Sequence, residues 1–199
     1  MRHLIIIAVA LTLIGLVASA AALAQRTLPD RVKEYGDLRL SSAPTFPQMD
    51  LDNVVAKSDL IVRAKVISAQ IHLSSDQRYI FTDFGLQPIA VLVQRGPERT
   101  MPGSTPRLIV SVLGGEMVIE GHNVTWTDTS LERFEIGKEY VLFLQRSPAL
   151  DAYVLTGHSN GAFEVRNEGI EPRHGRSEHR GEPVGLFIKR VQAMIAHGR

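Results

Sequence analysis

The chain has 199 residues, of which 44% are hydrophobic, 22% charged and 6% aromatic, and this composition excludes a wholly disordered or collagen-like chain. Lys and Arg number 22 against 21 Asp and Glu, so the charge balance gives no support for nucleic-acid binding. Cysteine is absent, which excludes disulfides, thiolate-bound zinc and a cysteine nucleophile.

The N-terminal segment, residues 1–24, is predicted to be a signal peptide. A short basic lead is followed by an uncharged stretch over residues 4–24, which is apolar at first and rich in alanine at its end. Ala22-Leu23-Ala24 fits the small-x-small pattern that signal peptidases accept. Gln25 is therefore expected to be the first residue of the mature chain, with cleavage after Ala20 as the nearby alternative.

Removal of this segment would leave a protein without net charge outside the cytoplasm, in the periplasm or secreted. Cleavage takes away Arg2, one of the 22 basic residues, and none of the 21 acidic residues. No later apolar stretch is long enough to span a bilayer. The alternative is an uncleaved anchor, because an apolar run of about 20 residues can span a membrane. Residues 4–24 would then be the only contact with the membrane.

The next segment, residues 25–48, is polar and interrupted by three prolines, and it is predicted to be an irregular lead-in. A short helix is expected to follow, with Asp50 or Asp52 as its N-cap and an apolar stripe of Leu51, Val54 and Val55.

From residue 58 the apolar pattern changes to a period of two, which predicts a β domain over residues 49–166. Strands are expected at 60–66, 89–93 and 108–112, with weaker candidates at 117–119 and 124–126. Ile89, Val91 and Val93 are expected to share one face, and Pro88 marks a bulge or a sheet edge. Residues 140–144 are almost all apolar, which predicts a central strand covered on both faces.

The last part of the chain is predicted to hold a hairpin, a linker and a helix. Strands at 153–156 and 163–165 flank Asn160-Gly161, which suits a tight hairpin turn because both central positions need positive φ. Residues 167–182 are polar and contain glycine, so they are expected to form a linker. Residues 183–197 predict a C-terminal amphipathic helix, with an apolar stripe of Val184, Phe187, Ile188, Val191 and Ile195.

Many short strands without alternating helices predict a mainly β fold, an antiparallel OB-like barrel or sandwich with a short N-terminal helix and a C-terminal helix. The strand segments at 58–66, 81–84, 91–96, 137–144 and 161–165 follow one another in an order that resembles exported bacterial domains of unassigned function. Their pattern is similar to OB-like barrels of the netrin and tissue-metalloproteinase-inhibitor type. Those inhibitors place an N-terminal cysteine on the zinc of their target. This chain has no cysteine, so the resemblance implies neither that mechanism nor any functional residue.

Gly157-His158-Ser159-Asn160-Gly161 matches G-x-S-x-G, the nucleophile elbow of serine hydrolases, in which the serine sits on a strained strand-to-helix turn. The triad would need an acid and a base from later in the chain, for which the candidates are Glu168, Glu171, Glu178, His174 and His179. Residues 162–166 alternate like a strand, whereas the elbow must lead into a helix. The sequence therefore favours a hairpin turn, and it predicts no catalytic, cofactor-binding or metal-binding residues.

Three further sets of residues are weighed in the same way. A metal site is possible if His72, His122 and His158 converge in a barrel, but solvated or singly bonded histidines are favoured. A cluster of three arginines is expected to be solvated rather than to bind an anion, namely Arg173, Arg176 and Arg180. Four aromatic residues could line a ligand groove, although core or rim positions are favoured: Tyr79, Phe81, Phe84 and Trp126.

The function predicted from these patterns is that of an exported, non-catalytic binding or interaction module without a cofactor. Its partner would be an unidentified protein or small molecule. Two alternatives stay open: a small serine esterase that uses Ser159, and an envelope-associated structural protein tethered by residues 4–24.

Overall fold

The computed structural model describes residues 26–44, 46–95, 108–173 and 177–197, so the segment predicted to be a signal peptide lies outside the described residues. The helices are α2 (Leu28–Tyr35), α3 (Leu51–Lys57) and α4 (Val184–His197), with short 3₁₀ turns η1 (His158–Gly161) and η2 (Ser177–His179). The strands are β1 (Leu38–Ser42), β2 (Leu60–Leu73), β3 (Ile80–Gln94), β4 (Leu108–Leu113), β5 (Gly115–Ile119), β6 (His122–Asp128), β7 (Glu139–Ser147), β8 (Ala152–Leu155), β9 (Ala162–Arg166) and β10 (Gly169–Pro172). The predicted fold class, mainly β with short N-terminal and C-terminal helices, is confirmed.

The large sheet has the strand order β10-β9-β7-β2-β3-β4-β8, and β8 also pairs with β7. The strands β7, β2, β3, β4 and β8 thus form a barrel-like ring. One side of the ring is narrow, because β4 meets β8 at a single residue pair, Val110 and Tyr153. That contact is parallel, and the other pairings of the large sheet are antiparallel.

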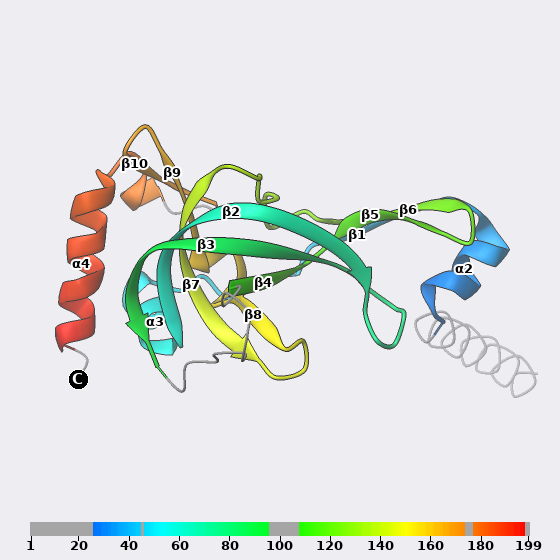
Figure 1. Cartoon of the computed structure of the whole chain (residues 1–199), viewed down its shortest axis with the longest axis horizontal. Coiled ribbons are helices and arrows are strands. Elements are labelled where there is room, and N and C mark those ends of the chain that lie inside the picture. Colours follow the sequence, from blue (N-terminus) through cyan, green and yellow to red (C-terminus); the bar gives the residue numbers. More distant parts are fainter. Residues whose placement is uncertain (1–25, 45, 96–107, 174–176, 198–199) are drawn as a thin grey trace, which may run out of the picture.

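The small sheet has the order β1-β6-β5 and lies with α2 at the opposite end of the molecule from α4 (Figure 1). The long strands β2 and β3 extend from the ring toward it. The irregular lead-in predicted for residues 25–48 is wrong, because α2 and β1 lie within it. Thr27 caps α2 and a proline occupies its first turn. β1 pairs in parallel with β6, so its partner is more than 80 residues away and local periodicity cannot show the pairing.

Two irregularities in the pairing of β2 with β3 change which β3 side chains face the core. Arg63 pairs with Ala90 and Ala64 with Pro88, so Ile89 is an extra residue, as expected for a bulge at Pro88. Leu92 is a second extra residue. The expectation that Ile89, Val91 and Val93 share a face is wrong: the first two are 49% and 52% exposed, whereas Val93 is 7% exposed. The extra residue at Leu92 reverses the alternation.

β7 is buried on both faces, as its apolar run predicts. Tyr140, Leu142 and Leu144 belong to the core inside the ring. Val141 and Phe143 belong to a second core, which α3 and α4 cover from outside. The predicted helix is confirmed as α3. Of its two candidate caps, Asp50 is the N-cap: its side chain accepts from the backbone N–H of Asn53 at 2.8 Å, and Asp52 lies in the first turn. A third core joins α2 and the small sheet to the far ends of β2 and β3.

The hairpin predicted at Asn160-Gly161 is wrong. β8 and β9 both pair antiparallel with the same edge of β7, so they lie end to end, and the residues between them form a loop in which Ser159, Asn160 and Gly161 are buried. Asn160 and Gly161 lie in η1, whereas the left-handed residues are Gly157 and His158, at φ 63° and 58°. A Cβ atom at Gly161 would come within 2.9 Å of the Phe143 carbonyl oxygen, so this close return to β7 requires glycine.

The segment 167–182, predicted to be a linker, contains β10 and η2, and β10 extends the large sheet by pairing with β9. The predicted C-terminal helix is confirmed as α4. None of the helices within the described ranges is long and apolar enough to cross a membrane.

Candidate functional site

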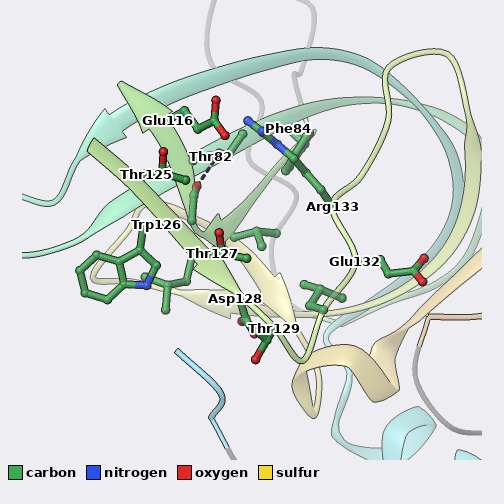
Figure 2. Close-up of a pocket in the computed structure, with 15 residues that line it drawn as sticks. Thr82, Phe84, Glu116, Thr125, Trp126, Thr127, Asp128, Thr129, Glu132 and Arg133 are labelled. Carbon is green, nitrogen blue, oxygen red and sulfur yellow. Dashed lines mark hydrogen bonds between the residues drawn. The ribbon is translucent and has the colours of Figure 1, made fainter. Parts of the chain in front are cut away.

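A pocket lies where the chain passes from the large sheet into the small sheet (Figure 2). Its volume is about 310 Å³, at the lower end of the range for small-ligand sites. Three structural units form it: the ends of β3 and β4, the strands β5 and β6, and the loop after β6. The lining residues are Thr82, Phe84, Val112, Leu113, Gly114, Gly115, Glu116, Thr125, Trp126, Thr127, Asp128, Thr129, Leu131, Glu132 and Arg133.

The first wall is the turn at Gly114 and Gly115, where β4 leads directly into β5. Both residues have positive φ, 115° and 152°, which favours glycine. A Cβ atom at Gly115 would lie 2.9 Å from Cγ2 of Ile71. The hydroxyl of Thr82 donates to the Gly114 carbonyl at 2.6 Å. The sharp passage between the two sheets is therefore fixed by main-chain geometry and by a hydrogen bond.

The second wall is the loop over residues 129–138, which a buried ion pair holds in place. Arg173 donates through Nη1 to Glu164 at 2.7 Å and through Nη2 to the carbonyl of Arg133 at 2.8 Å. Its guanidinium also lies 2.9 Å from the carboxylate of Glu132. The side chains of Arg173 and Glu164 are only 4% and 3% exposed. The position of the pocket wall thus depends on a charge pair from β9 and the end of β10.

Further cations surround the carboxylate of Glu164. Burial opposes its ionisation, but hydrogen bonds from Arg166 and Lys138 outweigh burial and hold the pKa of Glu164 below its ordinary value of 4.5. Glu164 is therefore charged at neutral pH and available to hold Arg173.

Asp128, at the end of β6, is the buried acid of the pocket. Its Oδ1 accepts from the backbone N–H of Ser130 at 2.9 Å and from its hydroxyl at 2.7 Å. Its Oδ2 contacts Nε2 of His158 at 2.7 Å. The ring of Phe46 stacks on His158 with centroids 4.4 Å apart, and Nδ1 of His158 is buried without a hydrogen-bond partner among the residues that the structure describes. These contacts tie the small sheet to η1 of the ring.

The rim of the pocket carries two charges that have no ion-pair partner within the described part of the chain. Glu116 lies on β5 and Arg133 on the loop, and Figure 2 shows the ends of their side chains pointing toward one another. Neither side chain takes part in an ion pair or side-chain hydrogen bond with another described residue. Glu132 and Asp128, in contrast, are held by Arg173 and by Ser130 and His158.

Ser159 of the G-x-S-x-G motif is buried in η1 and is followed by β9, whereas the nucleophile elbow leads into a helix. No described histidine or carboxylate hydrogen-bonds to its side chain. Of the candidate partners, His179 contacts Glu178 and Glu182, and Glu171 pairs with Arg180. His174 lies outside the described residues, and Glu168 is exposed.

The three histidines that could have converged lie beside three different carboxylates. His72 is 3.2 Å from Asp83, His122 is 3.3 Å from Asp37, and His158 contacts Asp128. Within the part of the chain that the structure describes, no group of three or more potential ligands is placed to hold a metal ion.

Each ring nitrogen of His72 has a contact, and the two contacts affect its pKa. Its Nδ1 lies 2.9 Å from the Leu73 carbonyl and its Nε2 faces Asp83. Burial lowers the pKa of His72, but these contacts outweigh burial and raise it above 6.5. Ser111 donates to the other oxygen of Asp83 at 2.5 Å.

The predicted arginine cluster does not form a solvated group. Arg173 is buried, Arg180 pairs with Glu171, and Arg176 lies outside the described residues. The burial of Arg173 corrects the expectation that all three are solvated. Its contacts with Glu164, Glu132 and the carbonyl of Arg133 compensate for that burial.

The four aromatic residues divide between two places. Tyr79 contacts Trp126 and Phe81, with centroids 5.4 and 6.5 Å away, and it is partly exposed. Phe84 is buried against Phe134 in the core. Trp126 and Phe84 both line the pocket. The sequence analysis missed Glu116, Asp128 and Arg133, because no local pattern sets these residues apart from other charged surface residues.

Comparison of the chain with protein-family models and with curated proteins finds no match. The resemblance to netrin-like and inhibitor-like OB barrels therefore stays a prediction.

Proposed function

We propose that this protein is an exported, non-catalytic binding module and that the pocket between the two sheets is its ligand site. The observation that carries the proposal is that contacts within the chain fix both walls of the pocket. Glycine geometry and Thr82 fix one wall, and the Arg173–Glu164 pair fixes the other. A preformed site loses little conformational entropy when a ligand binds.

The lining suits binding better than catalysis. Apolar side chains from Phe84, Val112 and Leu131 form part of the surface, and threonine hydroxyls and two unpaired charges stand among them. Such a mixture is typical of small-molecule sites, where apolar surface gives affinity and a few polar groups give orientation. Nucleophilic catalysis needs a nucleophile within hydrogen-bond reach of a base, and the described lining residues contain no such pair.

The test uses the intrinsic fluorescence of Trp126, because it is the only tryptophan of the chain and lines the pocket. We expect members of a library of small polar and apolar fragments to change its emission in a saturable way. Thr127→Phe should block the pocket and abolish the effect. The matched control is Val118→Phe, because Val118 is 64% exposed on β5 and does not line the pocket. The proposal is overturned if no fragment binds, or if Thr127→Phe binds the same fragments as the wild type.

The esterase alternative has its own experiment. Ser159→Ala and the wild type should hydrolyse an activated ester at the same background rate. Hydrolysis that depends on Ser159 would show that the protein is an esterase and would contradict the proposal of a non-catalytic binding module.

Export is tested by sequencing the N-terminus of the protein recovered from a bacterial host. We expect the chain outside the cytoplasm to begin at Gln25, or at Ala21 if the nearby site is used. Retention in the membrane with an intact N-terminus would support the tethered alternative.

A further inference from the structure

We propose that the pocket takes a zwitterionic ligand with a compact apolar body, such as an apolar amino acid or dipeptide. This inference rests on the proposed function, since it names the class of ligand for the same pocket. It is carried by one juxtaposition at the rim of a largely apolar cavity: Arg133 and Glu116, which have no ion-pair partner among the described residues, face one another.

The two charges of the rim are available because the other charged lining residues are already bound. Asp128 is buried and holds Ser130 and His158. Glu132 lies against the guanidinium of Arg173. Glu116 and Arg133 are therefore the two lining charges without a partner among the residues described. A ligand can pair with both only if it carries both signs.

Ligands with one charge are less well matched. An anionic amphiphile could pair with Arg133, but its headgroup would approach the carboxylate of Glu116 (Figure 2). A cationic amphiphile could pair with Glu116 and would meet Arg133. Like charges at such distances repel, and a rim charge that loses water without gaining a partner is costly. A zwitterion avoids both penalties.

The main chain prepares Arg133 for this role. Its carbonyl accepts from Arg173 at 2.8 Å, which fixes the start of the side chain, and its guanidinium has no ion-pair partner among the residues described. A guanidinium presents a planar fork of N–H donors that matches a carboxylate. An ammonium group has three donors, which suit the carboxylate of Glu116 and the neighbouring hydroxyl of Thr125, its partner across β5 and β6.

The apolar lining and the volume of the cavity determine the size and apolar character of the ligand. Phe84, Val112, Leu113 and Leu131 surround a cavity of about 310 Å³. This cavity is large enough for an aromatic or branched side chain and small enough to exclude a folded partner. The inference therefore names amino acids and dipeptides rather than a protein surface.

The experiment compares four probes by titration calorimetry on the mature chain. The zwitterions are L-phenylalanine and L-leucyl-L-leucine; hydrocinnamate lacks the ammonium group of phenylalanine, and phenethylamine lacks its carboxylate. We expect at least one of the two zwitterions to bind. The zwitterion that binds should do so at least about tenfold more tightly than hydrocinnamate or phenethylamine.

Variants of the rim assign each charge. Arg133→Gln should remove the advantage of the zwitterion over phenethylamine, and Glu116→Gln should remove its advantage over hydrocinnamate. Arg39→Gln and Glu168→Gln are matched controls, because both residues are exposed and lie outside the pocket. The controls should bind like the wild type. Thermal unfolding of each unliganded variant checks that the fold is intact.

The outcomes separate this inference from the proposed function. If a singly charged analogue binds as tightly as the zwitterion, or if the rim variants bind like the controls, the ligand class is wrong and the pocket still stands as a binding site. The same holds if neither zwitterion binds while the fragment screen finds pocket ligands. If the zwitterions and the fragments all fail to bind, both the ligand class and the proposed function are wrong.

Discussion

Glu164→Gln should destabilise the protein strongly, although Glu164 lies outside the pocket. Gln keeps the shape of the side chain and removes the charge, so the guanidinium of Arg173 stays buried with only the exposed Glu132 as a charged partner. Removal of one partner from a buried ion pair costs about 3–5 kcal/mol. For a domain of this size that loss lowers the melting temperature by on the order of 10 °C.

The assay is thermal and urea unfolding near neutral pH. The matched control is Glu171→Gln, because Glu171 pairs with Arg180 at a position that is more exposed. Exposed pairs contribute about 0–1 kcal/mol, so the control should differ little from the wild type. Replacing both Glu164 and Arg173 with Met should restore part of the loss, because no buried charge is then left alone. A loss for Glu164→Gln as small as that of the control would refute the claim that this pair holds the pocket wall.

The same pair also predicts a pH dependence. The pKa of Glu164 is lowered in the folded chain from its ordinary value of 4.5. Its contribution is therefore fully present above that value and is lost as pH falls through the folded pKa. The difference between Glu164→Gln and the wild type should shrink in acid. A difference that stays constant from neutral to acid pH would contradict this assignment.

Three further predictions follow from other contacts. Gly115→Ala should cost about 1–3 kcal/mol in urea unfolding, because φ 152° and the close approach of Ile71 both disfavour a Cβ atom; an unchanged midpoint would show that the turn is not constrained. The raised pKa of His72 means that its contact with Asp83 stabilises the chain below pH 6.5 and that this contribution is lost as pH rises through the folded pKa. Asp83→Asn should therefore lower stability at mildly acidic pH by less than about 1 kcal/mol, since the pair is partly exposed, and have a smaller effect at alkaline pH; the reverse order would disprove the contact. Asp128→Ala should cost about 1–3 kcal/mol, because Ser130 and His158 lose a buried acceptor, and wild-type stability in thermal unfolding would argue against a structural role.

Sequence patterns predicted those elements whose apolar residues are the ones that the fold buries. The five apolar residues of β7 predicted a strand buried on both faces, and the structure buries them between two cores. The cap at Asp50 and the apolar stripe of α4 were also sufficient to predict helices. In each case the apolar pattern of one segment matches the core that it contacts.

The elements that were missed depend on partners far away in the chain. β1 is a strand because it pairs in parallel with β6. The loop between β8 and β9 forms because both strands pair with the same edge of β7. The dipeptide Asn160-Gly161 suits a hairpin turn, but the strands before and after it both pair with β7 and not with each other. Long-range pairing therefore overrode the local preference of the turn.

The candidate site could not be predicted for the same reason. Glu116, Asp128 and Arg133 come from two strands and a loop. The passage at Gly114 and Gly115 and the Arg173–Glu164 pair together bring them to one cavity. The two glycines were a signal in the sequence, because adjacent glycines between strands often mark a sharp change of direction. Their meaning depends on the small sheet, whose first strand the sequence analysis did not predict.

The central claim is that the pocket between the two sheets is a ligand site. The most direct measurement is a nuclear magnetic resonance titration of the isotope-labelled chain with the tightest-binding probe. The account predicts saturable shifts of backbone amides in residues 112–116 and 125–133, with the resonances of α3 and α4 unchanged. Shifts centred on other surfaces, or a spectrum that changes throughout when the ligand binds, would contradict it.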